Sequence, residues 1–330
     1  MTRIGLAMMV KNEAPRIVRA LDSARPFIDF ALVTDTGSTD GTQDIVRRWL
    51  GEHGVPSEVR EVEWRDYGWN RSRVLELMGE HNVDYALMLD GDEILEGSLD
   101  RASLSAPCYD LVVRESGKIG QTCLLPRLTS NRVTFVYRGV VHEFLDAPPG
   151  PLLEGPSIVS VLDDKPRRDP SRYRREAELL TAALAKTDDI HLKNRYAFYL
   201  AQSWKNCGEL KKALAAYIAR ARLGGWIEEV YVSIVMAARL RERLGEPLEQ
   251  TLRTYQAAIA LNPKRLEAVH GAARACRLAG RYEDGRRFAM KGVGLPLWRG
   301  LFAEPWIWRH GLNDELSICA ARAGQGAVDG

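Results

Sequence analysis

The sequence has few cysteines and no pattern that would join them. Its 330 residues include five cysteines, which are scattered along the chain without a CxxC pair. An odd, dispersed set of thiols argues against a disulfide framework and fits a reducing compartment. The six histidines form no HxxxH or HExxH pattern, which argues against a zinc site.

Long apolar segments are also absent from the sequence. No run approaches the roughly 18 apolar residues that a membrane-spanning helix needs, and the start, MTRIGLAMMVKNE, lacks the apolar region of a signal peptide. With 45% hydrophobic and 27% charged residues, the composition is that of an ordinary soluble globular protein. We therefore expect a cytoplasmic protein without a membrane span, long enough for two domains.

Charge divides the chain into two different halves. Residues 1–165 carry 18 Lys and Arg against 26 Asp and Glu, a net charge of −8. Residues 166–330 carry 28 against 18, a net charge of +10. We take these halves as the two domains. A basic half attracts an acidic partner, nucleic acid included, or complements its acidic neighbour.

An acidic cluster follows directly on an apolar run in YALMLDGDEILE (85–96). Residues 85–89 suit a strand buried on both faces of a parallel sheet, although periodicity alone leaves a helix open. Ligands bind where such strands end. Asp90, Asp92 and Glu93 would repel one another there unless a cation or a shared proton neutralises them, and Mg²⁺ and Mn²⁺ prefer oxygen ligands. The sequence thus indicates a metal–phosphate site, with a solvated turn that caps the next helix as the alternative.

The first half repeats a strand–loop–helix pattern. Residues 4–10 and 30–34 read as strands, and each is followed by a polar turn and apolar residues at helical spacing. A further strand is expected over 157–162, after an irregular Pro- and Gly-rich loop over 147–156. Repeated β–loop–α units predict a mainly parallel sheet. The turn DTGSTDGT has neither P-loop nor GxGxxG spacing, so its first residue, Asp35, is either a turn former or an acceptor for a base or ribose.

Five motifs occur in an order that resembles the GT-A glycosyltransferases of family 2. They are MMVKNE, VTDTGSTDGT, DYGWNRS, LMLDGDE and YRGVVHEFL. The resemblance implies an α/β, Rossmann-like GT-A nucleotide-sugar domain over residues 1–165, with Asp90-Gly91-Asp92 as its DxD element. It also implies a nucleotide-sugar donor, usually a UDP-sugar, whose diphosphate is bridged to the protein by Mn²⁺ or Mg²⁺. On this interpretation the cation and the diphosphate offset the crowded carboxylates.

The resemblance assigns the nucleoside to one group of residues. It implies that Val10, Asn12, Glu13 and Asp35 lie around the base and the ribose. Asp35 is the strongest candidate among them, since it ends a predicted strand and its carboxylate can accept hydrogen bonds from a base or ribose.

A second group of residues matches another segment of the family. Asn70 and Arg71 match the family's Phe-Gly-x-Asn-Arg segment, with Tyr67 in place of the phenylalanine. A guanidinium fork suits phosphate, so Arg71 is expected to contact the donor or to hold Asp90. The alternative is an arginine on the surface of the amphipathic helix that the spacing predicts over residues 70–81.

The resemblance also implies a metal site and a general base. Asp92 is expected to ligate the metal directly, and Asp90 to contact ribose or to reach the metal through water. His142 matches a family histidine that completes the metal shell, although a lone histidine is more often structural. Inverting sugar transfer needs a base to take the acceptor's proton, and Glu143 is the first choice. The rival bases are Glu93, Glu115, Asp163 and Asp164.

The second half contains a helical repeat. Three blocks, 195–221, 230–263 and 268–296, each consist of two predicted helices around a glycine, and these glycines are 37 and 35 residues apart. This spacing is close to the tetratricopeptide (TPR) period of about 34 residues. It predicts an all-α TPR-like domain over 166–330, stacked as a solenoid whose concave face commonly holds a peptide or another protein. Aromatic side chains at matching positions, such as Tyr217, are expected in the core.

Two classes of function follow from these features. The first is a metal-dependent, inverting glycosyltransferase that uses a nucleotide-sugar donor and modifies a saccharide, a peptide side chain or a nucleic-acid base. The second is a TPR-type interaction scaffold whose transferase domain has lost its activity. Loss of activity is argued against by the motif residues that the sequence retains, namely Asp35, Asp90, Asp92 and His142. The basic half also allows protein or nucleic-acid contacts, and DNA binding there would weaken steeply with salt.

Overall fold

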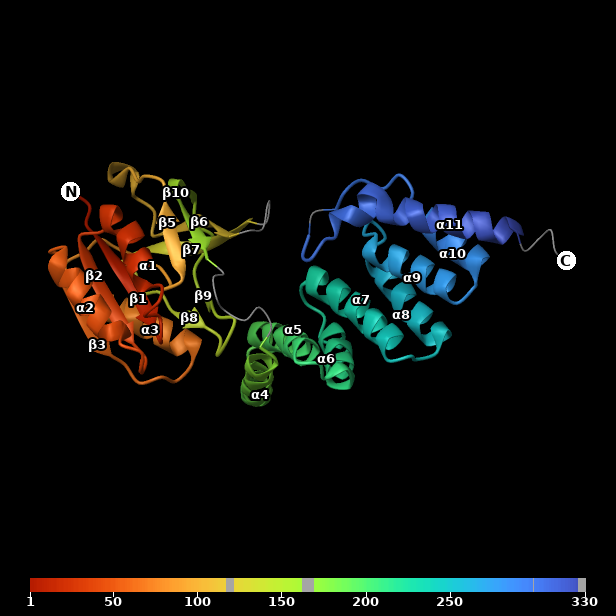
Figure 1. The fold of residues 1–330 in the computed structure, drawn as a ribbon, viewed down its shortest axis with the longest axis horizontal. Coiled ribbons are helices and arrows are strands. Elements are labelled where there is room, and N and C mark those ends of the chain that lie inside the picture. Colours follow the sequence, from red (N-terminus) through yellow and green to blue (C-terminus); the bar gives the residue numbers. More distant parts are fainter. Residues whose placement is uncertain (117–121, 162–168, 299, 326–330) are drawn as a thin grey trace. The chain divides into compact units, whose positions relative to one another are not determined.

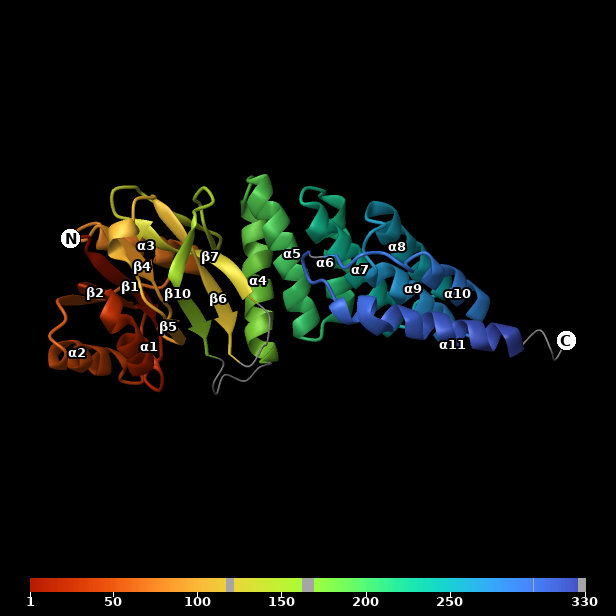
Figure 2. The ribbon, with the colours of Figure 1, turned by 90° about the horizontal axis from the view of Figure 1, so that it is seen from above.

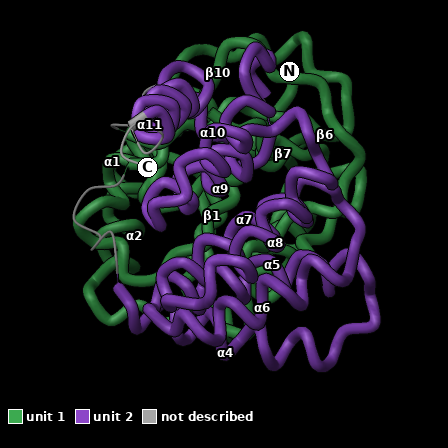
Figure 3. Tube along the Cα trace, turned by 90° about the vertical axis from the view of Figure 1, so that its right-hand side faces the viewer, with its two compact units in different colours: residues 1–167 green, residues 168–330 purple. Residues whose placement is uncertain are grey.

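Two compact units make up the chain (Figure 1, Figure 3). The structure, a computed structural model, describes residues 1–116, 122–161, 169–298 and 300–325. One unit spans Met1–Arg167 and the other Arg168–Gly330. The boundary expected between 165 and 166 lies outside the described residues.

The first unit combines strands from its whole length in one sheet. The strands of this sheet are β1 (Ile4–Val10), β2 (Phe30–Asp35), β3 (Ser57–Glu61), β4 (Tyr85–Met88), β5 (Glu93–Glu96), β6 (Cys108–Glu115), β7 (Thr122–Ser130) and β10 (Leu152–Ser160). Their order is β3-β2-β1-β4-β7-β6-β10-β5. A separate pair is formed by β8 (Tyr137–Arg138) and β9 (Phe144–Leu145). The helices are α1 (Ile17–Ala24), α2 (Thr42–Glu52), α3 (Tyr67–Met78) and the 3-10 turns η1 (Arg25–Phe27) and η2 (Arg101–Ser103).

Parallel pairing covers only part of this sheet. The neighbours β3, β2, β1 and β4 run parallel, as do β6 and β10. In contrast, β7 runs antiparallel to β4 and β6, and β5 runs antiparallel to β10. The prediction of a mainly parallel sheet is therefore wrong beyond β4. Antiparallel neighbours need no crossover helix, so the strand–loop–helix pattern of the first residues does not extend to this part.

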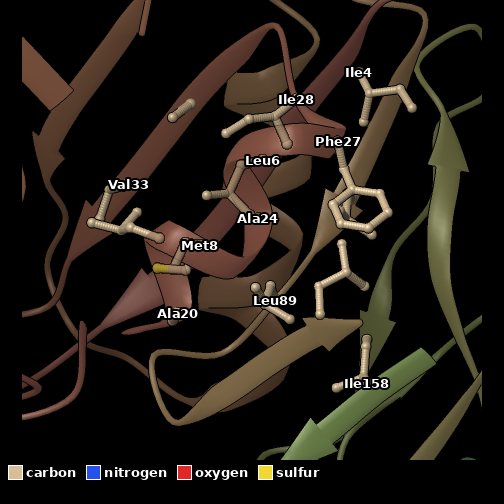
Figure 4. Packing of buried hydrophobic residues seen from close by; sticks show 14 of the residues in the cluster. Ile4, Leu6, Met8, Ala20, Ala24, Phe27, Ile28, Val33, Leu89 and Ile158 are labelled. Carbon is tan, nitrogen blue, oxygen red and sulfur yellow. The ribbon is translucent and has the colours of Figure 1, made fainter. Parts of the chain in front are cut away.

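Successive side chains of the central strands point to opposite faces of the sheet and form two core clusters, one on each face. Leu6 and Met8, both labelled in Figure 4, belong to the cluster on one face. This cluster also holds Leu21 of α1, while Ala7 packs with Leu77 of α3 on the other face. All five side chains are fully buried. Burial of a large apolar side chain stabilises a fold by about 1.5–3 kcal/mol. Burial on both faces explains why β1 is a continuous apolar run rather than an alternating one.

The helix that carries Arg71 starts earlier than its apolar spacing suggests. We expected it over 70–81, but α3 spans Tyr67–Met78. The side chain of Asp66 accepts a hydrogen bond from the Trp69 amide at 2.8 Å and thereby caps the first turn. Periodicity does not register such a cap, because the first turn of α3 contributes little to the apolar stripe.

The acidic cluster lies in a turn between two strands. β4 ends at Met88 and β5 begins at Glu93, so a strand rather than a helix follows Asp92. The alternative of a helix-capping turn is therefore wrong. The loop expected over 147–156 is also shorter than predicted, because β10 begins at Leu152 and tolerates its Gly and Pro through a register shift against β6.

The second unit consists of stacked helices (Figure 2). They are α4 (Pro170–Lys186), α5 (Ile190–Asn206), α6 (Leu210–Arg222), α7 (Ile227–Arg243), α8 (Leu248–Leu261), α9 (Glu267–Leu278), α10 (Tyr282–Met290), the π-helix η3 (Ile307–Gly311) and α11 (Leu312–Gln325). The three predicted blocks correspond to the pairs α5–α6, α7–α8 and α9–α10. Between the helices of these pairs, Gly208, Gly245 and Gly280 adopt φ values of 85°, 69° and 73°, which favour glycine at a helix end. The predicted helical repeat is thus present in the fold.

Aromatic side chains of the repeats lie in the core, as predicted. Tyr217 and Tyr255 are 1% and 0% exposed. The core also holds charge: Arg220 donates to Glu229 at 2.7 Å and to the Gly224 carbonyl at 2.7 Å. Within the described ranges, every helix is too short or too polar to cross a membrane.

Candidate active site

Three strands of the first unit end at the same edge of the sheet. β2, β1 and β4 are parallel neighbours, with Val10 opposite Asp35 and Ala7 opposite Met88. Because adjacent strands lie about 4.8 Å apart, the ends of β2 and β4 are separated by roughly 10 Å. Carboxyl ends of parallel strands are where ligands of open α/β sheets bind. The predicted site residues Asp35 and Asp90 therefore mark two positions along one edge.

Asp35 combines a bonded oxygen with an unbonded one. Its Oδ1 accepts hydrogen bonds from the amides of Gly37, at 2.8 Å, and Ser38, at 2.7 Å. Its Oδ2 is buried and has no hydrogen-bond partner in the described part of the chain. Both interpretations of Asp35 thus have support: one oxygen shapes the turn and the other is available as an acceptor. A buried carboxylate oxygen without a donor costs free energy, which a ligand donor would offset.

Val10 and Asn12 hold this edge together. The carbonyl of Val10 accepts a hydrogen bond from the Thr36 amide at 3.0 Å. Asn12, at a φ of 56°, accepts from the Thr39 amide at 2.8 Å through Oδ1 and donates its own amide to Ser38 Oγ at 2.9 Å. These bonds join the loop after β1 to the loop after β2, so both residues shape the surroundings of Asp35.

Glu13 lies beside the DxD turn. A Cβ added to Gly91 would come within 2.9 Å of Glu13 Cγ, so a side chain at position 91 would displace Glu13. The Glu13 amide donates to Thr42 Oγ1 at 2.9 Å. Glu13 therefore lies between Thr42, at the start of α2, and the acidic turn, and Gly91 permits the close approach.

Arg71 joins two of the predicted carboxylates. Its Nη2 donates to Asp90 Oδ2 at 2.8 Å and its Nε to Glu143 Oε1 at 2.6 Å. Burial alone would lower the pKa of Arg71, but Asp90 and Glu143 hold it well above its ordinary value. Of the two roles expected for Arg71, the structure shows that it holds Asp90.

Arg127, which sequence reasoning missed, completes the cluster. Its Nη2 donates to Glu93 Oε1 at 2.6 Å, and its Nη1 lies 3.7 Å from Asp90 Oδ2. The side chain is 9% exposed. The sequence does contain a sign of this contact, namely an arginine inside the strand TCLLPRLTS. An arginine that is buried in a strand needs an acidic partner.

Glu93 is fully engaged and cannot take a proton from an acceptor without rearrangement. Besides the bond to Arg127, its Oε2 accepts the Asp90 amide at 2.9 Å. Burial raises the pKa of the Glu93 carboxyl, and Arg127 opposes the increase. Glu143 differs, since Oε1 alone is bonded within the described residues. Of these two candidate bases, Glu143 is the one with an oxygen to spare.

The cluster is neutralised largely by arginine. Asp90, Glu93 and Glu143 carry three negative charges, and Arg71 and Arg127 supply two positive ones within salt-bridge distance. We expected a cation and a diphosphate to make this crowding tolerable. The two guanidinium groups already offset the charges of Asp90 and Glu93, and the expected part of the cation and the diphosphate stays a prediction.

The remaining acidic residue of the DxD turn is half-buried. Asp92 accepts the Val161 amide through its main-chain oxygen at 3.0 Å. In the described ranges, no three His, Cys, Asp or Glu side chains are grouped so as to hold a metal ion. Carboxylate oxygens at this turn suit Mg²⁺ or Mn²⁺, but such an ion would need ligands from a bound molecule. A cation bound at this turn would therefore be shared with a substrate.

His142 has a strained backbone next to Glu143. Its φ of 53° is in the left-handed region, which costs a non-glycine residue free energy. Among the described residues, positive φ at non-glycine positions occurs at Asn12, His142 and Phe302, and two of these three are predicted site residues. Such strain gathers at functional sites, and periodicity gives no sign of it.

Asn70 supports a loop and does not join the cluster. Its Nδ2 donates to the Glu63 carbonyl and its Oδ1 accepts the Arg65 amide, both at 2.9 Å. The side chain is buried. Asn70 thus holds the segment before α3, which positions Arg71 one residue later.

Glu115 is the last residue of β6. It lies at the same edge of the sheet as Asp90 but extends beyond the acidic cluster. Leu87 of β4 lies opposite Leu128, which in turn lies opposite Tyr109 of β6. Glu115 follows Tyr109 by six residues, whereas Asp90 follows Leu87 by three. Glu115 therefore lies roughly 10 Å beyond the level of the cluster. The other rival bases, Asp163 and Asp164, fall outside the described residues.

Gly68 allows α3 to approach the segment that carries Glu143. Its amide donates to the Gly139 carbonyl at 3.1 Å, and an added Cβ would come within 2.5 Å of that oxygen. We expect Gly68→Ala to destabilise the protein by about 1–3 kcal/mol, because backbone must move, and to weaken the Arg71–Glu143 bond. Urea unfolding measures the change.

Gly51→Ala is the matched control for this substitution. Gly51 also lies in a helix, and an added Cβ would meet no atom within 4 Å. Its replacement should be neutral or stabilise by up to about 1 kcal/mol, since alanine favours helices. Equal effects of the two substitutions would contradict the close approach at Gly68.

The fold is an α/β unit with a mixed sheet, followed by an all-α unit of helical repeats. No family model matches the sequence. A TPR repeat-containing protein of Synechococcus elongatus is 25% identical over 314 residues, which cover 86% of this chain and 72% of the relative. An uncharacterized glycosyltransferase of Rickettsia felis is 34% identical over 76 residues, or 20% of this chain and 27% of the relative.

A likeness to a solved structure extends over both units. TarS from S. aureus aligns with 76% of this chain and 54% of its own, at 12% sequence identity and a TM-score of 0.42. A likeness at this level carries no argument about activity.

Proposed function

We propose that the protein is a metal-dependent, inverting glycosyltransferase that uses a nucleotide-sugar donor, with UDP-sugars as the first choice. The observation that carries the proposal is the pair of positions along one sheet edge. Asp35 offers a buried, unbonded acceptor oxygen, and roughly 10 Å away an arginine-supported acidic turn follows β4. A ligand with a hydrogen-bonding base at one end and a diphosphate at the other matches this separation.

The residues of the edge divide the work of binding. Asp35 Oδ2 would accept a hydrogen bond from the base or ribose, within the loops that Val10 and Asn12 hold together. Asp92, with His142 and with Asp90 directly or through water, would hold Mn²⁺ or Mg²⁺ together with the diphosphate. Such an ion, when bound, stabilises the charge on the leaving diphosphate. Glu13 would stay beside the DxD turn and limit the room around the ribose.

Arg71 and Glu143 would form the acceptor side of the site. Arg71 holds Asp90 and Glu143 at once, so it fixes both carboxylates relative to each other. Glu143 Oε2 would take the proton from the acceptor hydroxyl or thiol as that atom attacks the anomeric carbon. The acceptor's class is a saccharide, a peptide side chain or a nucleic-acid base.

Hydrolysis of nucleotide sugars tests the proposal without an acceptor. UDP- and GDP-sugars would be incubated with the full chain and Mn²⁺, and release of the nucleoside diphosphate measured. We expect release for one donor class and its loss with EDTA. Absence of both hydrolysis and Mn²⁺-dependent UDP binding would favour the alternative, a TPR-type scaffold, which the likeness to the Synechococcus protein keeps open.

The substitution Asp35→Asn distinguishes the roles of the two carboxylate oxygens of Asp35. The amide keeps Oδ1 as the acceptor for Gly37 and Ser38 but replaces the unbonded Oδ2 by an NH₂ group. We expect UDP affinity, measured by titration calorimetry, to fall about tenfold or more. The melting temperature should stay constant or rise, because a buried unpaired charge is removed.

Asp44→Asn is the control for this substitution. Asp44 lies on α2, and its side chain is 87% exposed. The same change of charge there should leave UDP affinity unaltered. If Asp35→Asn bound UDP as tightly as the parent protein, Asp35 would not contact the nucleoside.

A further inference from the structure

A pocket of about 420 Å³ is lined by three neighbouring helices of the second unit (Figure 1). Two of them, α6 and α8, are the second helices of successive pairs, and α7 packs against both. Lining residues recur at helical spacing, as Ile234, Ala237 and Arg241 do on α7. One stripe of each helix therefore faces the pocket, and every lining residue belongs to one compact unit.

All charged side chains that line this pocket in the described part of the chain are arginines. They are Arg222 of α6, Arg241 of α7 and Arg253 of α8. Arg241 donates to Glu246, which does not line the pocket. Arg222 and Arg253 are exposed and form no ion pair with any described residue. Three arginines and one glutamate leave a local charge of +2 that no carboxylate on the pocket wall offsets.

Arg241 has a buried nitrogen that lacks an acceptor. Its side chain is 13% exposed, and its Nε is buried without a hydrogen-bond partner among the described residues. A buried donor without an acceptor costs free energy. A ligand oxygen that reached this nitrogen would offset that cost.

Apolar side chains lie beside the arginines. Ile218 of α6 and Ile234 of α7 line the same pocket. Apolar surroundings lower the local dielectric and so strengthen the attraction between an arginine and an anion. A second pocket, of about 530 Å³ on α7 and α9, differs because Glu242 and Glu304 line it together with its arginines. The balance of charge thus favours anion binding in the pocket on α6, α7 and α8.

We propose that the pocket on α6, α7 and α8 binds phosphate, received by Arg222, Arg241 and Arg253. The guanidinium fork matches the geometry of phosphate oxygens. A phosphate monoester carries about −1.5 to −2 at neutral pH, which balances the local charge, whereas a single carboxylate would leave half of it. Two neighbouring phosphodiesters of a nucleic-acid strand supply the same charge. The ligand is therefore a free phosphate compound or a nucleic-acid strand.

Titration calorimetry on the full chain, at low salt and in EDTA, tests the proposal. EDTA prevents the metal-dependent binding proposed for the edge of the sheet, so the two proposals can fail separately. The probes are pyrophosphate, a short oligothymidylate and a short oligoglutamate. We expect at least one phosphate probe to bind, and oligoglutamate to bind about tenfold more weakly or less. Binding of pyrophosphate alone assigns the pocket to a free phosphate compound, and tighter binding of oligothymidylate assigns it to a nucleic-acid strand.

Arg253→Ala should weaken binding of the phosphate probe about tenfold or more, as expected for loss of a charge-assisted bond. Arg253 is exposed on α8, where alanine favours the helix, so the fold should be kept. Arg253→Lys should lose less affinity, because it keeps the charge and loses only the fork. Release of nucleoside diphosphate from a nucleotide sugar should not change in either variant.

Arg243→Ala is the matched control. Arg243 is also exposed and without an ion pair among the described residues, but it lies on the wall of the other pocket. Affinity of this variant for the phosphate probe should stay within about twofold of the parent.

Three results would overturn the proposal. The first is a parent protein that binds neither phosphate probe. The second is an affinity in Arg253→Ala that equals the affinity of the parent or of Arg243→Ala, since the pocket would then contribute nothing specific. The third is oligoglutamate that binds as tightly as the better phosphate probe, which would show that the pocket accepts any polyanion.

Discussion

Asp92→Asn is expected to reduce the hydrolysis of the nucleotide sugar on the order of 10³-fold. The proposed role of Asp92 is to hold the cation that is shared with the diphosphate. Loss of such a ligand removes several kcal/mol of charge stabilisation from the transition state, and each 1.36 kcal/mol corresponds to about a factor of ten in rate. The isosteric amide keeps the size of the side chain, and the main-chain bond to Val161 does not involve it.

Binding provides a second readout for Asp92. UDP affinity in Mn²⁺ should fall in Asp92→Asn and approach the affinity that the parent protein shows in EDTA. Asp44→Asn, the exposed control on α2, should keep both activity and binding, and circular dichroism should show an unchanged fold. An Asp92→Asn protein with more than half of the parent's activity would remove Asp92 from the metal site.

Arg127→Met is expected to destabilise the protein by about 3–5 kcal/mol, the usual cost of breaking a buried ion pair. Methionine keeps much of the volume but leaves Glu93, 5% exposed, without its cation. The pKa of the Glu93 carboxyl is already raised by burial, so the loss of Arg127 should raise it further. Chemical unfolding in urea at neutral pH, where the unpaired carboxylate costs most, measures the effect.

A double-mutant cycle identifies the cause of this loss. Glu93→Gln removes the unpaired charge, so adding it to Arg127→Met should restore part of the stability. Arg114→Met is the surface control, because Arg114 and its partner Glu96 are 44% and 48% exposed, and it should cost less than about 1 kcal/mol. A double mutant no more stable than Arg127→Met would show that packing, not charge, explains the effect.

The two arginines also affect the part that Asp90 can take in catalysis. Arg71 and Arg127 both approach Asp90 Oδ2, so Asp90 is already charge-compensated before any ligand binds. An aspartate in that state competes weakly for a cation, which leaves Asp92 as the better direct ligand. The expectation that Asp90 contacts ribose or reaches the metal through water stays a prediction.

Much of the architecture could be predicted because local patterns reflect burial. Continuous apolar runs marked β1, β2 and β4, since strands buried on both faces have no polar side. Glycines spaced near 36 residues marked the helix pairs, because each pair ends its first helix in a left-handed conformation. The strand–loop–helix pattern gave a wrong prediction beyond β4, where antiparallel strands form without an intervening helix.

The sequence by itself determined which residue types gather at the site, and therefore the class of chemistry that we propose. Only the tertiary structure decided how their charges are balanced. Glu93 meets Arg127 across 34 positions of the chain, and Arg71 meets Glu143 across 72. Such partners become neighbours through strand order and register, which depend on the packing of the whole sheet, whereas carboxylates three residues apart are visible in any local reading.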